Sequence, residues 1–321
     1  MERRKVVITE PIDHNGIDIL EREAEVIYLP QLRDQTLSDS IKKAHALVVR
    51  VAKISRDILE PAENLLVIAK HGVGYDNIDV EAATQKRILV INTPEANIES
   101  VAEHNLALML SLSKKICSSD RALRENRFKG QKDYIGVELK DKKLGMVGLG
   151  KIGSETACKC KAAFNMDILI YDPYIPKQKT DSLGYTKIEE LPDLLQESDY
   201  VVICVPLTKA TQNLISAKEL NLMKADAFLI NSSRGQIVDE AALYDYLVKG
   251  KIAGAALDVF THEPPPSDHP LLSLDNFIAT PHTGGVTAES MRRMAITLAE
   301  DVVRVFRGQQ PRFPVNLQVY S

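Results

Sequence analysis

Short apolar runs rich in β-branched residues recur along the chain, and amphipathic stretches separate many of them. This alternation predicts βαβ units and therefore parallel sheets. Runs such as VVICV and AFLIN are apolar at every position, which is typical of central strands covered by helices on both faces. The predicted strands are Val6–Thr9, Ala46–Arg50, Leu66–Ala69, Ile88–Asn92, Lys143–Val147, Asp167–Tyr171, Tyr200–Val205, Ala227–Asn231, Ala253–Val259 and Phe277–Thr280.

The runs fall into two series, and 321 residues exceed the roughly 100–150 that one ordinary domain needs. The first series ends near Pro94, and the second extends from Lys143 to about Pro281. Long helices are predicted at Ile98–Cys117 and at Ala288–Arg307, and we expect the last one to return to the first domain. The prediction is therefore an α/β protein with two doubly wound parallel-sheet domains, 1–98 with 288–321, and 99–287.

Composition excludes several classes of function. The formal charge is -4, from 40 Lys and Arg against 44 Asp and Glu, so no general positive field favours nucleic acid. No apolar run approaches the about 18 residues of a membrane span, and the first residues do not form a secretory signal. We expect a cytoplasmic protein without a membrane partner. The four cysteines are expected to be reduced thiols, and no metal-binding motif is present, so no metal is expected.

A glycine motif follows the predicted strand KLGMV and begins a predicted helix, Ser154–Phe164. In this context GxGxxG predicts a dinucleotide site. The first glycine permits a tight turn, the second lets the backbone approach a pyrophosphate, and the third lets helix and strand pack closely. The motif consists of Gly148, Leu149, Gly150, Lys151, Ile152 and Gly153.

The next predicted strand leads into Asp172, 19 residues after Gly153. A carboxylate at this position accepts hydrogen bonds from the adenosine ribose hydroxyls and repels a 2′-phosphate. Its neighbours include no Arg that could hold such a phosphate. The motif therefore predicts NAD as the cofactor, rather than NADP.

Three later strands each end in polar residues, which parallel pairing should bring to one rim of the sheet. Ser232, Ser233 and Arg234 follow the first of these strands, Glu263 follows the second and His282 the third. Arg offers a planar fork that matches a carboxylate. Imidazole can donate and accept a proton near neutral pH, and a neighbouring carboxylate orients it and favours its charged form. Arg234, Glu263 and His282 are therefore the predicted catalytic trio for hydride transfer to a 2-keto acid.

Together, LGMVGLGKIG, NSSRG, DVFTHEP, TPHTGG, KHGVGYDNID and NTPEANIESVAEHNLALMLSL resemble the D-isomer-specific 2-hydroxyacid dehydrogenase family over nearly the whole chain. The nearest likeness is to D-3-phosphoglycerate dehydrogenases and hydroxypyruvate reductases. The resemblance implies a flavodoxin-like substrate domain, a Rossmann NAD domain and a homodimer. It assigns the same trio to catalysis and the backbone of Val73 and Gly74 to the substrate carboxylate. It further assigns cofactor contacts to Val205, Pro206, Ser232, Asp258 and Gly285, with Asp258 on the nicotinamide carboxamide.

The substrate itself is less constrained. Arg50 follows a first-domain strand, and Lys70 precedes the loop of Val73 and Gly74, so two cations could bind a second anionic group such as the phosphate of 3-phosphoglycerate. Ordinary solvated or ion-paired roles for both residues remain open. The alternatives are a hydroxypyruvate or glyoxylate reductase, and an NADH-sensing protein like the corepressors of this fold. We expect no regulatory domain beyond Ser321 and therefore no feedback control through one. His71 and His104 are expected to be packing or surface residues.

Overall fold

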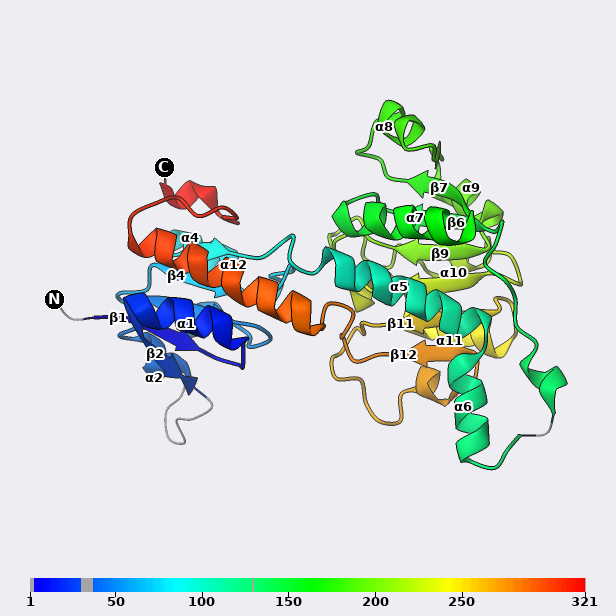
Figure 1. Cartoon of the computed structure of the whole chain (residues 1–321), viewed down its shortest axis with the longest axis horizontal. Coiled ribbons are helices and arrows are strands. Elements are labelled where there is room, and N and C mark those ends of the chain that lie inside the picture. Colours follow the sequence, from blue (N-terminus) through cyan, green and yellow to red (C-terminus); the bar gives the residue numbers. More distant parts are fainter. Residues whose placement is uncertain (1–2, 30–36, 129, 321) are drawn as a thin grey trace. The chain divides into compact units, whose positions relative to one another are not determined.

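Every pairing between named strands in the described residues is parallel, as the pattern of apolar runs predicted. The computed structural model describes residues 3–29, 37–128 and 130–320. Contacts divide the chain into unit 1, Met1–Asn97 with Val286–Ser321, and unit 2, Ile98–Gly285. Both units are α/β, which confirms the fold class (Figure 1). We propose that the units are the two domains, for which the predicted boundaries were 98 and 288.

Unit 1 contains a five-stranded sheet in the order β2-β1-β3-β4-β5, which is the flavodoxin-like order. The order reverses beside β1, at the pair β1 and β3. The strands are β1 Arg4–Ile8, β2 Ala24–Tyr28, β3 Ala46–Val49, β4 Val67–Lys70 and β5 Leu89–Ile91. The helices are α1 His14–Glu23, α2 Leu37–Ile41, α3 Arg56–Leu59, α4 Val80–Gln85 and α12 Ala288–Phe306.

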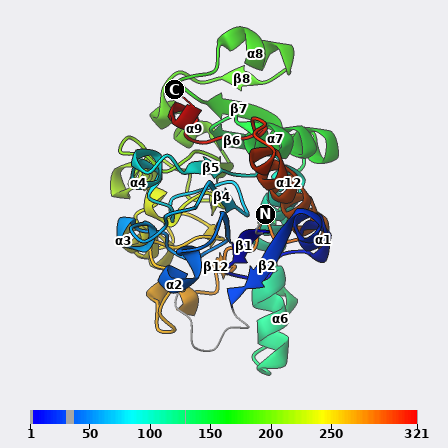
Figure 2. The same ribbon diagram turned by 90° about the vertical axis from the view of Figure 1, so that its left-hand side faces the viewer.

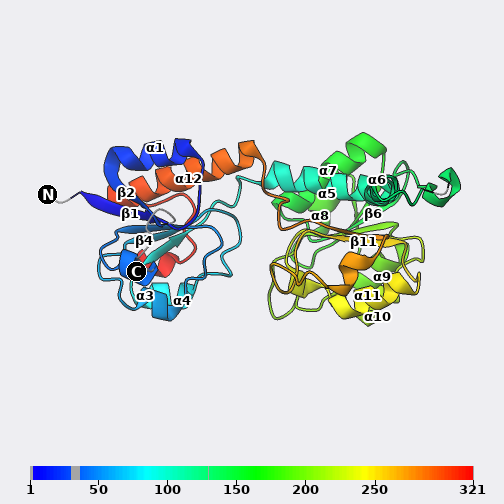
Figure 3. The ribbon, with the colours of Figure 1, turned by 90° about the horizontal axis from the view of Figure 1, so that it is seen from below.

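Alternate residues of the unit 1 strands build two separate cores. Val6, Val48 and Ala69 face a layer that contains Leu20 of α1 and Leu298 of α12. Their strand neighbours, Val7 and Leu47 among them, face the layer of α2, α3 and α4. Figures 2 and 3 show these two helical layers on opposite sides of the sheet. The β-branched runs are apolar throughout because both faces of each strand are covered.

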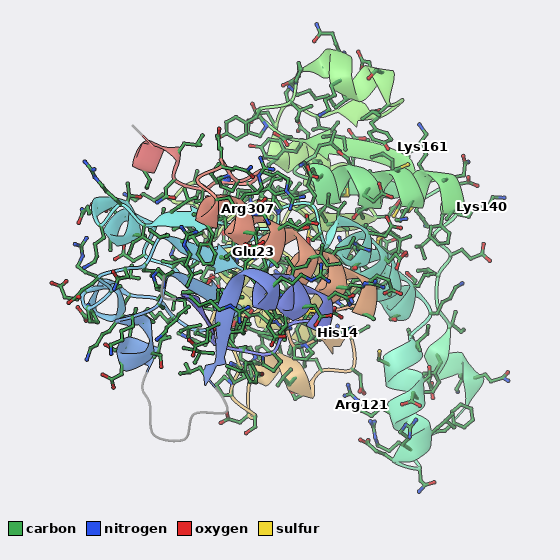
Figure 4. The ribbon with its side chains drawn as sticks, turned by 60° about the vertical axis from the view of Figure 1, so that its left-hand side comes forward. His14, Glu23, Arg121, Lys140, Lys161 and Arg307 are labelled. Carbon is green, nitrogen blue, oxygen red and sulfur yellow. The ribbon has the colours of Figure 1, made fainter. Side chains whose placement is uncertain are left out.

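The helix α12 packs against α1, although most of the chain separates them in sequence. The backbone of Gly16 on α1 lies so close to α12 that an added Cβ would be 2.6 Å from the Ala295 carbonyl oxygen. At the far end of the pair, Arg307 forms an ion pair with Glu23, and both side chains are labelled in Figure 4. Close backbone packing and this ion pair hold α12 on unit 1.

Unit 2 contains a seven-stranded sheet in the order β12-β11-β10-β9-β6-β7-β8. Counted from β6, this is the dinucleotide-binding order 3-2-1-4-5-6 with one further strand, and the order reverses between β6 and β9. The strands are β6 Lys143–Val147, β7 Asp167–Tyr171, β8 Thr186–Lys187, β9 Tyr200–Ile203, β10 Phe228–Asn231, β11 Gly254–Leu257 and β12 Phe277–Ala279.

Helices cover both faces of the unit 2 sheet (Figure 3). One face carries α5 Ile98–Ser113 and α7 Lys151–Phe164, and the other carries α9 Leu191–Glu197, α10 Ala217–Leu220 and α11 Glu240–Val248. The remaining elements of unit 2 are α6 Ile116–Arg124, α8 Lys177–Ser182 and the 3₁₀ turns Gln131–Tyr134, Gly235–Ile237 and Pro270–Ser273, and a further 3₁₀ turn, Leu317–Tyr320, lies in unit 1. No helix in the described ranges is long and apolar enough to span a bilayer.

Two features of the fold differ from the prediction. The sequence pattern missed β2 and β8, both of which pair with other strands along one edge only. The predicted helix Ile98–Cys117 is two helices, because Lys115 adopts a left-handed conformation with φ 52°. The chain at Gly136 passes directly over the end of α5, and the Val137 amide donates to the Ser113 carbonyl at 2.8 Å. A distant segment therefore terminates α5.

Asn316 fastens the C-terminal segment to the edge of the unit 1 sheet. Its side chain is 1% exposed, accepts from the Val90 amide at 2.7 Å, and donates to the Ile88 carbonyl at 3.0 Å and the Thr84 hydroxyl at 2.8 Å. Replacing it by Ala removes these partners from the buried Val90 amide and Ile88 carbonyl, whereas the Thr84 hydroxyl keeps its bond to the Val80 carbonyl.

We therefore expect Asn316→Ala to lower the free energy of unfolding of unit 1 by about 1–3 kcal/mol. Urea denaturation followed by circular dichroism measures this change. Asn64→Ala, at an exposed position of the same unit, is the matched control and should change the midpoint little. Equal midpoints for the two variants would show that Asn316 does not anchor the segment.

Candidate active site

The glycine loop joins β6 to α7 at the point where the strand order of unit 2 reverses. Gly148 has φ 96°, and a Cβ there would lie 2.6 Å from the Cys204 carbonyl oxygen. A Cβ at Gly153 would lie 2.3 Å from the Gly148 carbonyl oxygen. Gly150 differs, because a Cβ there meets nothing within 4 Å. The first and third glycines are needed for packing, whereas the second leaves open space at the N-terminus of α7, where a pyrophosphate fits.

Asp172 lies immediately beyond β7 and accepts two backbone hydrogen bonds. Its carboxylate binds the amide of Leu149 in the glycine loop at 2.9 Å and the amide of Tyr174 at 2.9 Å. Asp172 thus connects the glycine loop to the end of the next strand. The remaining lone pairs of its two oxygens can still accept from ribose hydroxyls.

His282 and Glu263 meet at the same rim, as the sequence suggested. Nδ1 of His282 lies 2.7 Å from a carboxylate oxygen of Glu263, whose other oxygen accepts from the Phe260 amide at 3.0 Å. Burial alone would raise the pKa of Glu263, but hydrogen bonds from His282 and Phe260 and the charges of His282 and Arg234 outweigh it and lower that pKa. Glu263 is therefore ionised at neutral pH and holds the imidazole by Nδ1.

Arg234 comes from the neighbouring loop after β10. Buried Asn231 fixes this loop by donating to the Arg234 carbonyl at 2.9 Å and accepting from the Ser233 amide at 2.9 Å. The next residue, Gly235, packs on the backbone that leads to Glu263, since a Cβ there would lie 2.0 Å from the Phe260 carbonyl carbon. Direct backbone packing thus couples the loop that carries Arg234 to the loop that carries Glu263.

Asp258 is 2% exposed and accepts hydrogen bonds from a loop of its own domain. The donors are the Thr280 hydroxyl at 2.6 Å and the amides of Thr283 and Gly284, each at 2.8 Å. Burial would raise the pKa of Asp258, but these bonds and one from His104 together lower it. The carboxylate therefore holds the loop of His282. The expected contact with a nicotinamide carboxamide would be a second role for the same side chain.

The other predicted cofactor residues surround the same rim. Ser232 donates to Asn105 at 2.7 Å, and Ser233 donates to the Ile203 carbonyl at 2.8 Å. Val205 and Pro206 follow β9, and Gly285 is the last residue of unit 2. Sequence reasoning missed the supporting residues Asn105, Asn231 and Thr280 and set His104 aside. His104 and Asn105 could have been found, because they form a polar pair within a largely apolar helix.

The predicted substrate residues of unit 1 lie beyond the ends of β3 and β4. Glu10 accepts from the Arg50 amide at 2.8 Å and fixes that loop. Lys70 is 8% exposed, and its ammonium donates to the Arg50 carbonyl and to Asn77. These bonds hold the loop together, so a direct contact between Lys70 and a substrate would require them to break. Among the described residues, the amides of Val73 and Gly74 donate to no protein group, so both are available to an anion, which is bound by such backbone N–H groups.

Comparison with known proteins identifies the family. The sequence model described as "D-isomer specific 2-hydroxyacid dehydrogenase, NAD binding domain" matches residues 106–284, more than half of the chain. The chain belongs to this family. Unit 2 contains its NAD-binding domain, and the glycine loop of this unit fits that cofactor.

Similar proteins have several activities. The chain is 43% identical to a D-3-phosphoglycerate dehydrogenase of Methanocaldococcus jannaschii over 98% of its own length, but it spans only 59% of that relative. It is 40% identical to a hydroxypyruvate reductase of Thermotoga maritima, over 95% of this chain and 99% of the relative. The solved structure of a D-lactate dehydrogenase from Aquifex aeolicus, complexed with NAD and lactic acid, matches with a TM-score of 0.83 and 30% identity, over 95% and 96% of the two chains.

The glycine loop predicts different results for two equal substitutions. Gly150→Ala should leave the melting temperature nearly unchanged but weaken NADH binding, because its methyl group enters the open space beside the helix N-terminus. Gly153→Ala should lower the melting temperature by several degrees, because its methyl group meets backbone. Thermal denaturation and NADH fluorescence titration measure the two effects. Normal NADH affinity in Gly150→Ala would place the pyrophosphate elsewhere.

His71 predicts a pH dependence of stability. It is 3% exposed, and neither ring nitrogen makes a hydrogen bond of normal geometry among the described residues, although backbone groups of Met291 and of His71 itself favour its charged form. Burial chiefly, and then the positive charge of Arg50, lower its pKa from 6.5 to about 4. As the pH falls, His71 is therefore protonated near pH 6.5 in the unfolded chain but only near pH 4 in the folded chain.

The stability contributed by neutral His71 should thus be present above pH 6.5 and be lost as the pH falls toward 4. The slope is at most about 1.4 kcal/mol per pH unit. His71→Leu should unfold in urea with a flatter pH dependence over this window, whereas the exposed control His14→Leu should retain the slope of the parent. Parallel slopes for His71→Leu and the parent would contradict the assignment.

Proposed function

We propose that the protein is an NAD-dependent dehydrogenase that transfers hydride between NAD(H) and C2 of a small 2-hydroxy or 2-keto acid. The observation that carries the proposal is the 2.7 Å pair of His282 and Glu263, which follows β11 and β12 in the same parallel sheet as the glycine loop. Proton exchange with a carbonyl and nicotinamide binding are the two functions that such a dehydrogenase has to combine.

Each member of the trio has a distinct role in the proposed reaction. Bound NADH supplies the hydride to C2 of the keto acid. Because Nδ1 of His282 faces Glu263, Nε2 is the nitrogen left to give a proton to the carbonyl oxygen, which becomes the hydroxyl. In the oxidation direction the same nitrogen takes that proton back. Arg234 binds the substrate carboxylate, whose planar geometry its guanidinium matches.

The proposed cofactor preference rests on Asp172. Its carboxylate is fixed by two backbone amides at the end of β7, and Pro173 and Tyr174 follow it in the sequence. A ribose with free hydroxyls can donate to it, while a 2′-phosphate would bring a second negative charge against it. We therefore propose that the protein prefers NAD to NADP.

The proposed substrate is a short acid with a second anionic group. In unit 1, Arg50 would bind that group, Lys70 would support the Arg50 loop, and the amides of Val73 and Gly74 would bind the carboxylate. Similar proteins named phosphoglycerate dehydrogenase and hydroxypyruvate reductase differ in whether their substrate carries a phosphate. The phosphorylated and the unphosphorylated three-carbon acids are therefore the two substrates to compare.

We also propose a homodimer in the cytoplasm. Support comes from exposed apolar side chains on α6 and on the segment that follows it. The ribbon of α6 extends away from the sheet of unit 2 in Figure 1. Ile135 is 72% exposed and Leu123 63%, and Phe128 stacks on Tyr134 nearby. Exposed apolar groups in such number favour a protein partner.

The direct experiment follows the loss of NADH absorbance with 3-phosphohydroxypyruvate, hydroxypyruvate, glyoxylate and pyruvate in parallel, in the parent and in Arg50→Ala. The proposal expects turnover of at least one acid and a preference for the phosphorylated one that Arg50→Ala removes. A preference for an unphosphorylated acid in both proteins would overturn the role of Arg50. Absence of turnover with all four acids would favour an NADH-binding protein without this activity.

The proton donor is tested by substitution. His282→Ala should lower kcat by about 10²–10⁴ and leave the Kd for NADH nearly unchanged, because the imidazole contacts the reacting oxygen and not the glycine loop. The control is His14→Ala, at an exposed position on α1. Normal turnover by His282→Ala would show that another group transfers the proton.

A further inference from the structure

His104 lies on α5, and its side chain is 19% exposed. Its Nε2 atom is 3.1 Å from the Thr280 hydroxyl oxygen and 3.4 Å from a carboxylate oxygen of Asp258. No step of the proposed reaction uses this histidine. All three residues belong to unit 2.

The direction of the hydrogen bonds follows from their number. A threonine hydroxyl has one hydrogen, and at 2.6 Å the Thr280 hydroxyl gives it to Asp258, which is ionised and can only accept. The same hydroxyl can therefore only accept from His104, so Nε2 of His104 carries a hydrogen. That hydrogen faces the Thr280 hydroxyl at 3.1 Å and the Asp258 carboxylate at 3.4 Å, so a chain of donation leads from His104 to Asp258, both through Thr280 and directly.

Asp258 in turn fixes the conformation of the catalytic loop. Its carboxylate accepts from the amides of Thr283 and Gly284, and its backbone carbonyl accepts from the His282 amide at 2.7 Å. His282 has φ 54°, a left-handed conformation that costs a non-glycine residue about 1–2 kcal/mol. Such a conformation persists only where its surroundings determine it, and Asp258 provides three of the bonds that do so.

Space around the chain of donation is also restricted. A Cβ at Gly284 would lie 2.9 Å from the Asp258 carboxylate and 3.1 Å from the His104 ring. The imidazole therefore packs on the loop backbone as well as donating toward it. Removal of the ring would take away the hydrogen-bond donor to Thr280 and the side chain that packs against Gly284.

We propose that His104 is a positioning residue, which through Thr280 and Asp258 keeps His282 in the orientation that proton transfer requires. This inference rests on the proposed function for its effect on catalysis. Its structural part, that His104 stabilises the backbone of 282–284, does not depend on the identity of the substrate. Removal of His104 should thus affect the chemical step and leave the glycine loop intact.

The test compares His104→Leu, which lacks the donor, with His104→Gln, whose amide can still donate. We expect His104→Leu to lower kcat by roughly 10- to 100-fold with the Kd for NADH within about twofold of the parent, since small misplacements of a catalytic group have effects of this size. His104→Gln should recover a large part of the loss. Thr280→Val, which interrupts the same chain, is the second variant and should resemble His104→Leu.

The matched control is Tyr200→Phe. The Tyr200 hydroxyl, on β9, forms a 2.7 Å hydrogen bond with the hydroxyl of Ser113 on α5, the helix that carries His104. This variant therefore removes one buried hydrogen bond of α5 that lies away from the loop of His282. It should lose stability but not kcat. A similar loss of kcat in Tyr200→Phe would mean that any damage to α5 lowers activity, which would overturn the specific role of His104.

Amide hydrogen exchange measures the loop without reference to turnover. The amides of residues 282–284 should exchange faster in His104→Leu and in Thr280→Val than in the parent and in Tyr200→Phe. Parental kcat together with parental exchange in both chain variants would overturn the inference while the proposed function stands. If the parent itself turned over no acid, the proposed function would fail. Hydrogen exchange would then decide the structural part alone: faster exchange of 282–284 in the two variants would support the positioning of the loop by His104, and unchanged exchange would overturn it.

Discussion

A fully parallel sheet delivers the carboxyl ends of all its strands to one rim, and the chemistry of this protein depends on that constraint. In unit 2 the glycine loop follows β6, Asp172 follows β7, Arg234 follows β10, Asp258 and Glu263 follow β11, and His282 follows β12, all in one sheet. The strands are apolar on both faces because helices cover both faces. Polar chemistry is thereby excluded from the interior of the sheet and concentrated where the strands end.

Loops at such a rim have left the strand ladder, so their backbone groups need other partners. Here side chains supply them. Asp172 binds two amides, Asn231 binds one amide and one carbonyl, Glu263 binds the Phe260 amide, and Asp258 binds the loop of His282. Glu263 combines this structural role with its bond to the imidazole. The strained backbone at His282 is held by the same kind of bond, so the carboxylates that stabilise these loops are also the ones that the proposed reaction needs.

Much of this arrangement could be predicted from the sequence because local patterns determine it. Apolar runs identified the central strands, and GxGxxG identified the loop between β6 and α7 at the point where the strand order reverses. The edge strands β2 and β8 were missed because their residues are only partly covered and carry a weaker apolar signal. The end of α5 at Ser113 was missed because a segment more than twenty residues later caps it. His104 was set aside for the same reason, since Asp258 and Thr280 lie far from it in sequence.

The central claim is that the rim of unit 2 supports hydride transfer to C2 of a keto acid, with His282 as the proton donor. The most direct test is a single turnover with NADH deuterated at the transferring C4 position, with the product analysed by mass spectrometry and NMR. The account predicts one deuterium on C2 of a D-2-hydroxy acid for each NADH consumed, and a much slower transfer in His282→Asn. Product without deuterium at C2, or transfer at an equal rate in the variant, would contradict it.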